Sequence, residues 1–286
     1  MERYDIAIIG AGPAGISAAI NAKIRRKSFI LLGSDTVSHK VGVSKEINNY
    51  PGIPSVSGEE LNRLLTAHAG SMGITVTKET VNGIYDMGGY FALLAGQQSF
   101  EARSVIIATG SENIKPVSGE KELLGRGVSY CATCDGGLYK GKTIAVFCDI
   151  PESEEETEYL AGLAAKVYYF PNFKSKLKAE NVVMPEGRIA AVTGTDKVDG
   201  IELKNGDRIE VDGVFFIKQA VAADVLLSGL ETENGVIAVD RRMRTNIDGC
   251  FAAGDCTGAP YQIAKAVGEG NVALHSALSY LANTEN

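Results

Sequence analysis

A glycine-rich turn near the start of the chain constrains the fold more than any other feature. Residues 4–9 (YDIAII) are an apolar run typical of a buried strand. Gly10-Ala-Gly12-Pro-Ala-Gly15 follows at once and leads into the helical pattern of ISAAINAKIRR. The next apolar run, residues 28–32 (SFILL), completes a strand–helix–strand unit of about 30 residues. This context predicts an α/β domain with a parallel sheet that binds a dinucleotide.

The three glycines of this turn have separate physical tasks. Gly10 permits the sharp turn, Gly12 lets backbone N–H groups approach a pyrophosphate, and Gly15 lets the helix pack tightly on the strand. The helix N-terminus then faces the phosphates with its partial positive charge. Asp35 lies 20 residues beyond Gly15, where an acid that binds a ribose is expected, although an acid in a solvated turn looks the same. The alternative for the whole segment is a purely structural turn.

A second feature is a pair of cysteines with C-x-x-C spacing, Cys131 and Cys134. Two thiols at this spacing can close a small disulfide ring, and one thiolate can be stabilised by its surroundings, which suits thiol–disulfide exchange. Asp135 follows directly and could pass a proton to a leaving thiolate, or could cap the turn. A zinc site would need further ligands, which only Cys250 and Cys256 could supply, since the three histidines are scattered. We therefore expect a redox pair and no metal.

Composition excludes several classes of protein. The net charge of −7 and the pI of about 5.2 give no global attraction for nucleic acid. The longest apolar runs have about five residues, against the ~20 that a membrane-spanning helix needs. The start of the chain has no secretory pattern, and five cysteines do not suggest a secreted disulfide framework. We expect a cytoplasmic protein whose Cys148, Cys250 and Cys256 pack in the core.

A second strand–helix–strand pattern lies in the middle of the chain. Residues 143–147 (TIAVF) and 166–170 (KVYYF) are expected strands, with a helix over 154–165 between them. The pattern changes again near residue 240, where 250–255 (CFAAGD) is an expected strand and 261–282 an expected long helix. The chain therefore divides into two α/β domains, with boundaries near residues 113 and 240.

Together these segments resemble the low-molecular-weight, bacterial-type thioredoxin reductases nearly from end to end. IIGAGPAG resembles the FAD pyrophosphate loop of that family, and SVIIATGS (104–111) resembles its second FAD segment. CFAAGD resembles the last FAD motif, where the aspartate binds the ribityl chain. Asn49-Tyr50-Pro51-Gly52 resembles its Asn-Trp-Pro-Gly segment beside the flavin. GVSYCATCDG (127–136) is nearly the redox-site signature of the family.

The resemblance implies an α/β fold with two Rossmann-like domains. Residues 1–113 and 241–286 would form a discontinuous FAD-binding domain, and residues 114–240 a central redox domain that carries the C-x-x-C. The implied FAD contacts are Gly10, Gly12, Pro13, Ala14, Gly15, Asp35, Asn49, Thr109, Gly110, Gly254, Asp255, Gln262, Ile263 and Ala264.

The resemblance also implies a homodimer that reduces thioredoxin. Electrons would pass from reduced FAD to the Cys131–Cys134 disulfide. By this analogy Cys134 faces the flavin, Cys131 attacks thioredoxin, and Asp135 donates the proton.

The sequence departs from that family where a second glycine-rich loop would bind NADPH. No glycine occurs between Lys142 and Gly162, and residues 149–158 contain six acids and no base. Two unit charges ~5 Å apart near a surface interact by ~3 kcal/mol, so this stretch would repel phosphates. Residues 170–173 (FPNF) replace the family's basic motif for the 2′-phosphate, and Tyr261 replaces an arginine before the last helix.

With these departures the chain is similar to the ferredoxin-dependent flavin thioredoxin reductases. We expect FAD but no NADPH, with reduced ferredoxin as electron donor and thioredoxin as acceptor. Ferredoxins are acidic, so candidate docking sites are three basic clusters, which could also be ordinary solvated surface: Arg25/Arg26/Lys27, Lys174/Lys176/Lys178 and Arg241/Arg242/Arg244. Three alternatives stay open: an atypical but working NADPH site, an FAD disulfide reductase with an unknown donor, and a non-catalytic flavoprotein that senses redox state.

Overall fold

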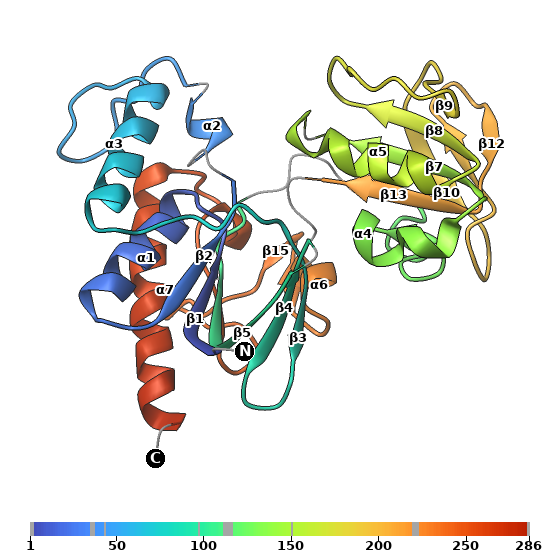
Figure 1. Ribbon diagram of the computed structural model, residues 1–286. Helices are drawn as coiled ribbons and strands as arrows, with labels where there is room; N and C mark the ends of the chain where they lie inside the picture. The colour runs from blue at the N-terminus through green and yellow to red at the C-terminus, as the bar shows by residue number, and fades with distance from the viewer. Residues whose placement is uncertain are drawn as a thin grey trace. The chain divides into compact units, whose positions relative to one another are not determined.

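Figure 1 shows the computed structural model of the chain, which describes residues 3–34, 38–42, 44–96, 98–110, 117–149, 151–218 and 223–284. The chain forms two compact units. The first unit contains Met1–Glu112 and Ala222–Asn286, and the second contains Asn113–Val221. The predicted α/β class is confirmed, as is the discontinuous course of the first unit.

The second boundary lies between residues 221 and 222, whereas the sequence pattern placed it near residue 240. The reason is apolar packing. Leu226, Leu227, Leu230 and Ile237 are buried in the same core cluster as the sheet of the first unit, and Leu227 forms a β-bridge with Ile84 of that sheet. The change of pattern at residue 240 therefore marks a turn within the first unit.

A six-stranded sheet forms the centre of the first unit. Its strands follow the order β2-β1-β5-β4-β3, and β16 pairs with β5 beyond the end of β4. β1, β2, β5 and β16 run parallel, while β3 and β4 form an antiparallel hairpin extension. The strands are β1 (Arg3–Ile9), β2 (Phe29–Leu32), β3 (Val81–Asp86), β4 (Phe91–Ala95), β5 (Gln98–Ile107) and β16 (Cys250–Ala252).

Two helices from opposite ends of the chain pack side by side against this sheet, α1 (Pro13–Ile24) and α7 (Ile263–Thr284) (Figure 1). Small side chains allow the close approach: a Cβ on Gly270 of α7 would lie 2.1 Å from the Ala14 carbonyl oxygen of α1. α3 (Gly58–Ser71) begins at Ser57, whose side chain accepts a hydrogen bond from the Glu60 N–H. The other face of the sheet packs against α6 (Ala223–Leu226) and β15 (Val236–Ile237), and β15 pairs with β14 (Thr232–Glu233).

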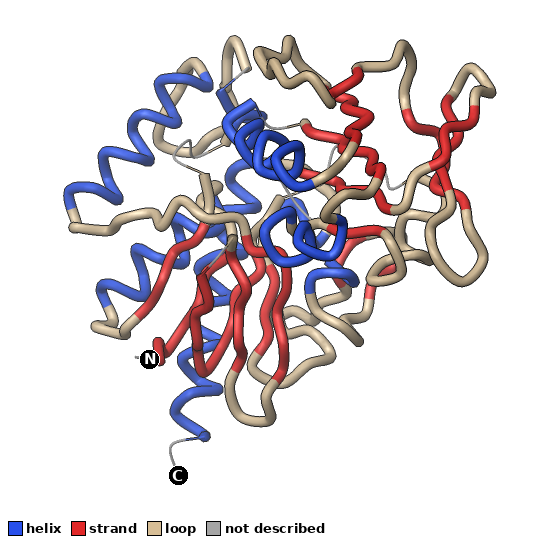
Figure 2. Tube along the Cα trace, turned by 45° about the vertical axis from the view of Figure 1, so that its right-hand side comes forward, coloured by secondary structure: helices blue, strands red, loops and turns tan. Residues whose placement is uncertain are grey.

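The second unit has a five-stranded parallel sheet, in the order β6-β13-β7-β8-β9. Figure 2 distinguishes the helices, strands and loops of the chain by colour. The strands of this sheet are β6 (Val128–Ser129), β7 (Thr143–Cys148), β8 (Lys166–Pro171), β9 (Val182–Val183) and β13 (Gly213–Ile217). α5 (Glu154–Leu163) packs on it through Leu160 and Ala161. A separate antiparallel sheet contains β10 (Ile189–Thr193), β11 (Gly200–Leu203) and β12 (Arg208–Glu210).

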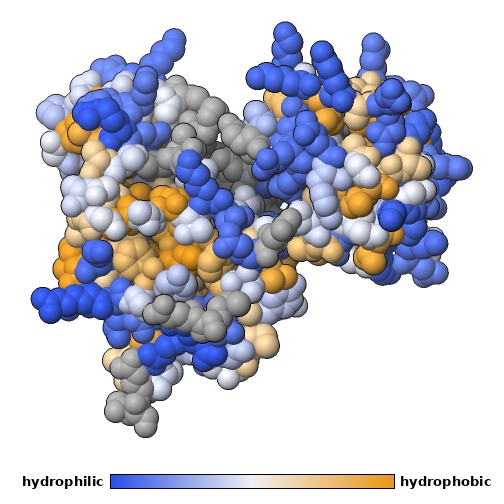
Figure 3. Space-filling view, in the orientation of Figure 1, coloured by the Kyte–Doolittle hydropathy of each residue, from blue (hydrophilic) through white to orange (hydrophobic). Residues whose placement is uncertain are grey.

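Hydrophilic side chains project from much of the face shown in Figure 3. Among the described residues, no helix has the length and apolar character to cross a membrane.

Candidate functional site

Three parallel strands of the first unit end at the same edge of their sheet. Ile9 at the end of β1 lies opposite Ile107 at the end of β5, and Ala252 at the end of β16 lies opposite Ile107 from the other side. The loops that follow these strands are therefore neighbours. In open parallel sheets, ligands bind beyond the carboxyl ends of the strands, so this edge is the candidate cofactor site.

The glycine turn after β1 has the geometry that its sequence predicts. Gly10 adopts a φ of +109°, and a Cβ there would lie 2.2 Å from the Ala108 carbonyl oxygen. A Cβ on Gly15 would lie 1.8 Å from the Gly10 carbonyl oxygen, so only glycine fits there. Gly12 is the N-cap of α1 and offers no side chain to satisfy the first N–H groups of the helix, and Pro13 follows at its first turn. This end of α1 is suited to an anion.

The other two loops contact this turn. Thr109 and Gly110 lie in the loop after β5, and Gly110 has a φ of +78°. Gly254 follows β16, and a Cβ there would lie 3.0 Å from the Cβ of Ala14. Asp255, half-buried, begins the short 3-10 helix η3 (Asp255–Thr257). The fold thus gathers the predicted residues of three sequence segments at one edge, while Asp35 lies outside the described residues.

Two residues that the sequence analysis missed hold the loop after β16. Lys265 Nζ donates hydrogen bonds to the carbonyl oxygens of Gly254 and Gly258, at 2.8 and 2.7 Å. Glu269 Oε2 accepts a hydrogen bond from the Gly254 N–H (2.9 Å) and forms an ion pair with Lys265 Nζ (3.0 Å). A Lys–Glu pair four residues apart in a largely apolar helix was the available signal. Together they fix the loop that carries Asp255.

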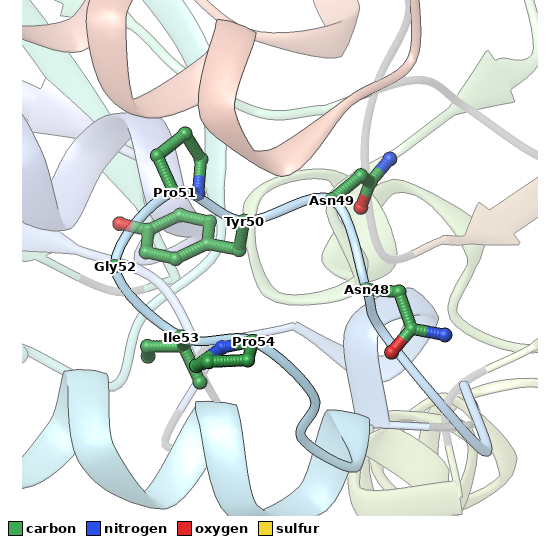
Figure 4. A pocket seen from close by; sticks show the side chains of 7 residues that line it. All are labelled: Asn48, Asn49, Tyr50, Pro51, Gly52, Ile53 and Pro54. Atoms are coloured by element: carbon green, nitrogen blue, oxygen red, sulfur yellow. The ribbon is translucent and has the colours of Figure 1, made fainter.

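A pocket of about 440 Å³ in the first unit is lined by residues 48–54 (Figure 4). Asn49 Nδ2 donates a hydrogen bond to Gln262 Oε1 (2.5 Å), which joins this loop to the start of α7. Ile263 packs on the same small apolar cluster as Tyr50 and Ile53. Of the predicted cofactor residues, the structure therefore brings Asn49, Gln262 and Ile263 together, and Ala264 lies exposed on the first turn of α7.

In the second unit, Cys131 and Cys134 form a disulfide with a Cα–Cα distance of 5.3 Å. Cys131 is the N-cap of the short helix α4 (Ala132–Asp135), and its Sγ accepts a hydrogen bond from the Cys134 N–H (3.2 Å). Ser129 Oγ accepts a hydrogen bond from the Cys131 N–H (3.0 Å). Cys131 is buried, at 7% exposure, whereas Cys134 is exposed. The two sulfurs therefore differ in their access to reaction partners.

Asp135 is half-buried directly after the disulfide. Its N–H donates a hydrogen bond to the Cys131 carbonyl oxygen (3.3 Å). Burial raises the pKa of Tyr139, and the negative charge of Asp135 raises it further. Asp135 therefore places a negative charge on the segment that carries the redox pair.

The other three cysteines are buried free thiols: Cys148, Cys250 and Cys256. Burial raises the pKa of Cys250 and of Cys256 to about 12, so neither is a thiolate at neutral pH. Among the described residues, no group of three or more His, Cys, Asp or Glu side chains could hold a metal ion.

A glutamate at the start of α5 contacts β8 and the segment that follows β8. Glu154, the first residue of α5, accepts hydrogen bonds from the Tyr169 hydroxyl (3.2 Å), the Lys176 N–H (3.2 Å) and the Ser175 hydroxyl. Burial, which raises the pKa of Glu154, is outweighed by hydrogen bonds from Ser175, Lys176 and Tyr169, so the pKa lies below its usual value. A fixed negative charge therefore lies between α5 and the segment after β8.

The sequence model of the pyridine nucleotide-disulphide oxidoreductase family matches residues 4–147 and 173–270. Thioredoxin reductase from Bacillus subtilis (strain 168) is 33% identical, over 97% of this chain and 95% of that protein. A solved ferredoxin-flavin thioredoxin reductase from Clostridium acetobutylicum is 50% identical with a TM-score of 0.91, over 100% of this chain and 99% of that chain. A thioredoxin reductase structure from Gloeobacter violaceus is 26% identical with a TM-score of 0.80, over 99% and 96% of the two chains. This chain therefore belongs to the pyridine nucleotide-disulphide oxidoreductase family and, within it, to the thioredoxin reductases.

Proposed function

We propose that this protein is a ferredoxin-dependent flavin thioredoxin reductase. Electrons from reduced ferredoxin would reach the Cys131–Cys134 disulfide by way of FAD and would leave to thioredoxin. The observation that carries this proposal is the position of the Glu154 carboxylate, at the place where an NADPH-dependent relative needs a phosphate site. The similarity to the ferredoxin-flavin enzyme from Clostridium acetobutylicum supports the same assignment.

Negative charge at the start of α5 opposes the binding of NADPH phosphates. Glu154, Glu155 and Glu156 fill the first turn of α5, and the Glu154 carboxylate is fixed by three hydrogen-bond donors. A phosphate ~5 Å away would meet a repulsion of ~3 kcal/mol from each charge near a surface. The matched family segments also leave out residues 148–172, which contain this turn. We therefore propose that the second unit no longer binds a nicotinamide nucleotide.

The FAD site that we propose lies at the strand edge of the first unit. The uncapped start of α1 at Gly12–Gly15 would bind the pyrophosphate, and Gly10 would let the chain turn beneath it. Asp255 would bind the ribityl chain. When bound, FAD supplies a centre that can hold one or two electrons. We also assign Asp35, Asn49, Thr109, Gly110, Gly254, Gln262, Ile263 and Ala264 to this site.

The two cysteines would have different roles. Cys134 is exposed and would face the flavin; two electrons and two protons convert the disulfide to two thiols. Cys131 would then attack the thioredoxin disulfide as a thiolate, and Cys134 would release reduced thioredoxin by closing the ring again. Asp135 would supply the proton to the leaving thiolate. Cys131 is buried in the disulfide form, so the attack requires that this sulfur becomes accessible.

Ferredoxin would dock on the basic residues of the first unit that lie nearest to the cofactor edge of that unit. Arg244 lies opposite Phe251 of β16, and Arg241 and Arg242 are exposed on the turn before it. The cluster at residues 25–27 lies at the other end of α1, whose 12 residues span about 18 Å from the glycine turn. We therefore favour Arg241 and Arg242 as the docking cluster. We further propose that the protein acts as a homodimer in the cytoplasm.

Anaerobic reduction tests the donor. The purified flavoprotein is mixed separately with NADPH and with reduced ferredoxin, and the flavin absorbance is followed. Ferredoxin should bleach the flavin and NADPH should not, and bleaching by micromolar NADPH would overturn the proposal. Reduction of thioredoxin should be lost in Cys131→Ser, while the flavin is still bleached by ferredoxin.

A further inference from the structure

The second unit contains a buried ionic cluster that the proposed electron path does not use. Glu120 is fully buried, and Lys218 and Tyr130 are 5% and 9% exposed. Lys218 Nζ lies 2.5 Å from Glu120 Oε1, and the Tyr130 hydroxyl donates a hydrogen bond to the same oxygen (2.6 Å). Glu120 Oε2 accepts a hydrogen bond from the Val117 N–H (2.9 Å). Both oxygens of the carboxylate are therefore satisfied.

Stability alone does not account for this cluster. Removing two charges from water is costly, and well-packed apolar side chains of the same volume are often at least as stable as a buried ion pair. Aromatic rings flank the ammonium: the Phe216 ring centroid lies 4.9 Å from Lys218 Nζ, and the Tyr130 ring centroid lies 5.8 Å from it. Hydrogen bonds differ from apolar contacts in fixing direction. The cluster therefore specifies the positions of the segments that carry it.

The cluster joins three parts of the second unit: its first residues, its last residues and the segment that carries the redox disulfide. The unit begins at Asn113 and ends at Val221, and the cluster includes Val117 near its start and Lys218 near its end. Tyr130 directly precedes Cys131. On the same segment Ser129 Oγ accepts a hydrogen bond from the Cys131 N–H. The two residues before Cys131 are thus both anchored by side-chain hydrogen bonds.

We propose that Glu120, Lys218 and Tyr130 are positioning residues for the redox disulfide. They hold the Cys131 backbone where its sulfur can meet that of Cys134. Closing a disulfide ring depends on how often the two sulfurs are within reach, so a fixed Cys131 favours the disulfide. In exchange with a small dithiol, one protein disulfide and one reductant dithiol become one protein dithiol and one oxidised reductant. Loosening Cys131 should shift this equilibrium toward the protein dithiol.

The test uses a matched pair of tyrosine variants. Tyr130→Phe removes the hydroxyl that binds Glu120, and Tyr169→Phe removes a hydroxyl of the same unit that binds Glu154 instead of Glu120. Each flavoprotein is equilibrated without oxygen in a series of dithiothreitol buffers, quenched with acid, alkylated after denaturation and weighed by mass spectrometry. The three free cysteines give three adducts in every case, and a reduced Cys131–Cys134 pair adds two more.

Tyr130→Phe should favour the dithiol by about 3- to 10-fold, where tenfold corresponds to about 30 mV for a two-electron couple. Tyr169→Phe should match the unaltered protein, and all three should show the same flavin spectrum. An unchanged equilibrium in Tyr130→Phe, a shift toward the disulfide, or an equal shift in Tyr169→Phe would overturn the proposal.

A double variant provides an independent check. Glu120→Gln with Lys218→Met removes both charges at once, so that no unpaired charge is left in the core. It should shift the equilibrium toward the dithiol, as Tyr130→Phe does. If Tyr130→Phe does not fold, the double variant tests the positioning role in its place. An unchanged equilibrium in the double variant would count against positioning. The measurement involves neither ferredoxin nor NADPH, so its outcome is independent of the electron donor.

Discussion

Lys265 and Glu269 lie one turn apart on α7 and together fix both ends of the loop that follows β16. The ammonium of Lys265 donates to carbonyl oxygens at Gly254 and Gly258, and the carboxylate of Glu269 accepts the N–H of Gly254. Both side chains are largely buried, at 15% and 19% exposure. A residue pair on a helix therefore sets the position of Asp255, which in our proposal binds the flavin.

Replacing Lys265 with methionine should weaken FAD binding. The change removes three hydrogen bonds from a charged donor and leaves Glu269 without its ion pair. One hydrogen bond to a charged group contributes about 1.5–3 kcal/mol, and a loss of this size in FAD binding is an increase of about 10- to 100-fold in the FAD dissociation constant. Fluorescence titration of the apoprotein measures it. Lys204→Met, at an exposed lysine of the second unit, is the control and should bind FAD normally. An unchanged FAD affinity in Lys265→Met would show that the loop after β16 keeps its position without Lys265.

Substitution of Gly15 by alanine should destabilise the first unit and abolish tight FAD binding. The new Cβ would lie 1.8 Å from the Gly10 carbonyl oxygen, and neither backbone segment can move without displacing the glycine turn. Overpacking of this kind costs about 1–3 kcal/mol or more. Gly70→Ala in α3 is the matched control, because a Cβ there has no neighbour within 4 Å. It should be neutral or stabilise the protein by about 0.5–1 kcal/mol. Thermal unfolding and FAD titration separate the two variants, and similar behaviour would contradict the packing argument.

Features that depend on neighbouring residues in the sequence were predicted well. The run from residue 4 to residue 32 contains its strand, its glycine turn and its helix within one local pattern, and β1, α1 and β2 lie where that pattern places them. The spacing of the C-x-x-C pair alone was enough to predict a redox pair, and Cys131 and Cys134 form a disulfide in the structure. The long last helix was expected over 261–282 and spans Ile263–Thr284.

Features that depend on tertiary contacts were not predicted. Glu154 and Ser175 meet across 21 positions, and Glu120 and Lys218 across 98, so no local pattern identifies either pair. The acidic residues after β7 indicated a lost phosphate site, but the sequence could not show that one of them is fixed by hydrogen bonds. The boundary lies near residue 222 and not near residue 240, because the few apolar residues between them do not reveal from the sequence which sheet they cover.

Glu154 should make the stability of the second unit sensitive to acid. Its pKa is lowered in the folded protein, so it contributes stability that is fully present above its unfolded pKa of about 4.5 and is lost as the pH falls through its folded value. Glu154→Gln should remove this contribution, so that the free energy of unfolding depends less steeply on pH below about 5. Denaturant unfolding from pH 7 to pH 3 measures the effect. The control is Glu155→Gln, at an exposed neighbour, and an equal change in both variants would contradict the assigned hydrogen bonds.

Charge reversal should distinguish the candidate docking clusters for ferredoxin. Arg241→Glu with Arg242→Glu places two acids near the end of β16 that leads to the cofactor edge. Arg25→Glu with Arg26→Glu makes the same change of charge at the far end of α1. An acidic donor should be repelled by the first variant, and we expect its KM at low salt to rise roughly tenfold.

The difference should shrink as salt is added, since surface charges are screened over about 10 Å at 0.1 M and about 3 Å at 1 M. This salt dependence is measured by stopped flow, which follows the bleaching of the flavin by reduced ferredoxin across this range of salt. The variant at residues 25 and 26 should retain its rate because its site is about 18 Å from the glycine turn. Equal losses in both variants would point to net charge, and a loss only at residues 25 and 26 would place the docking site at the opposite end of the sheet.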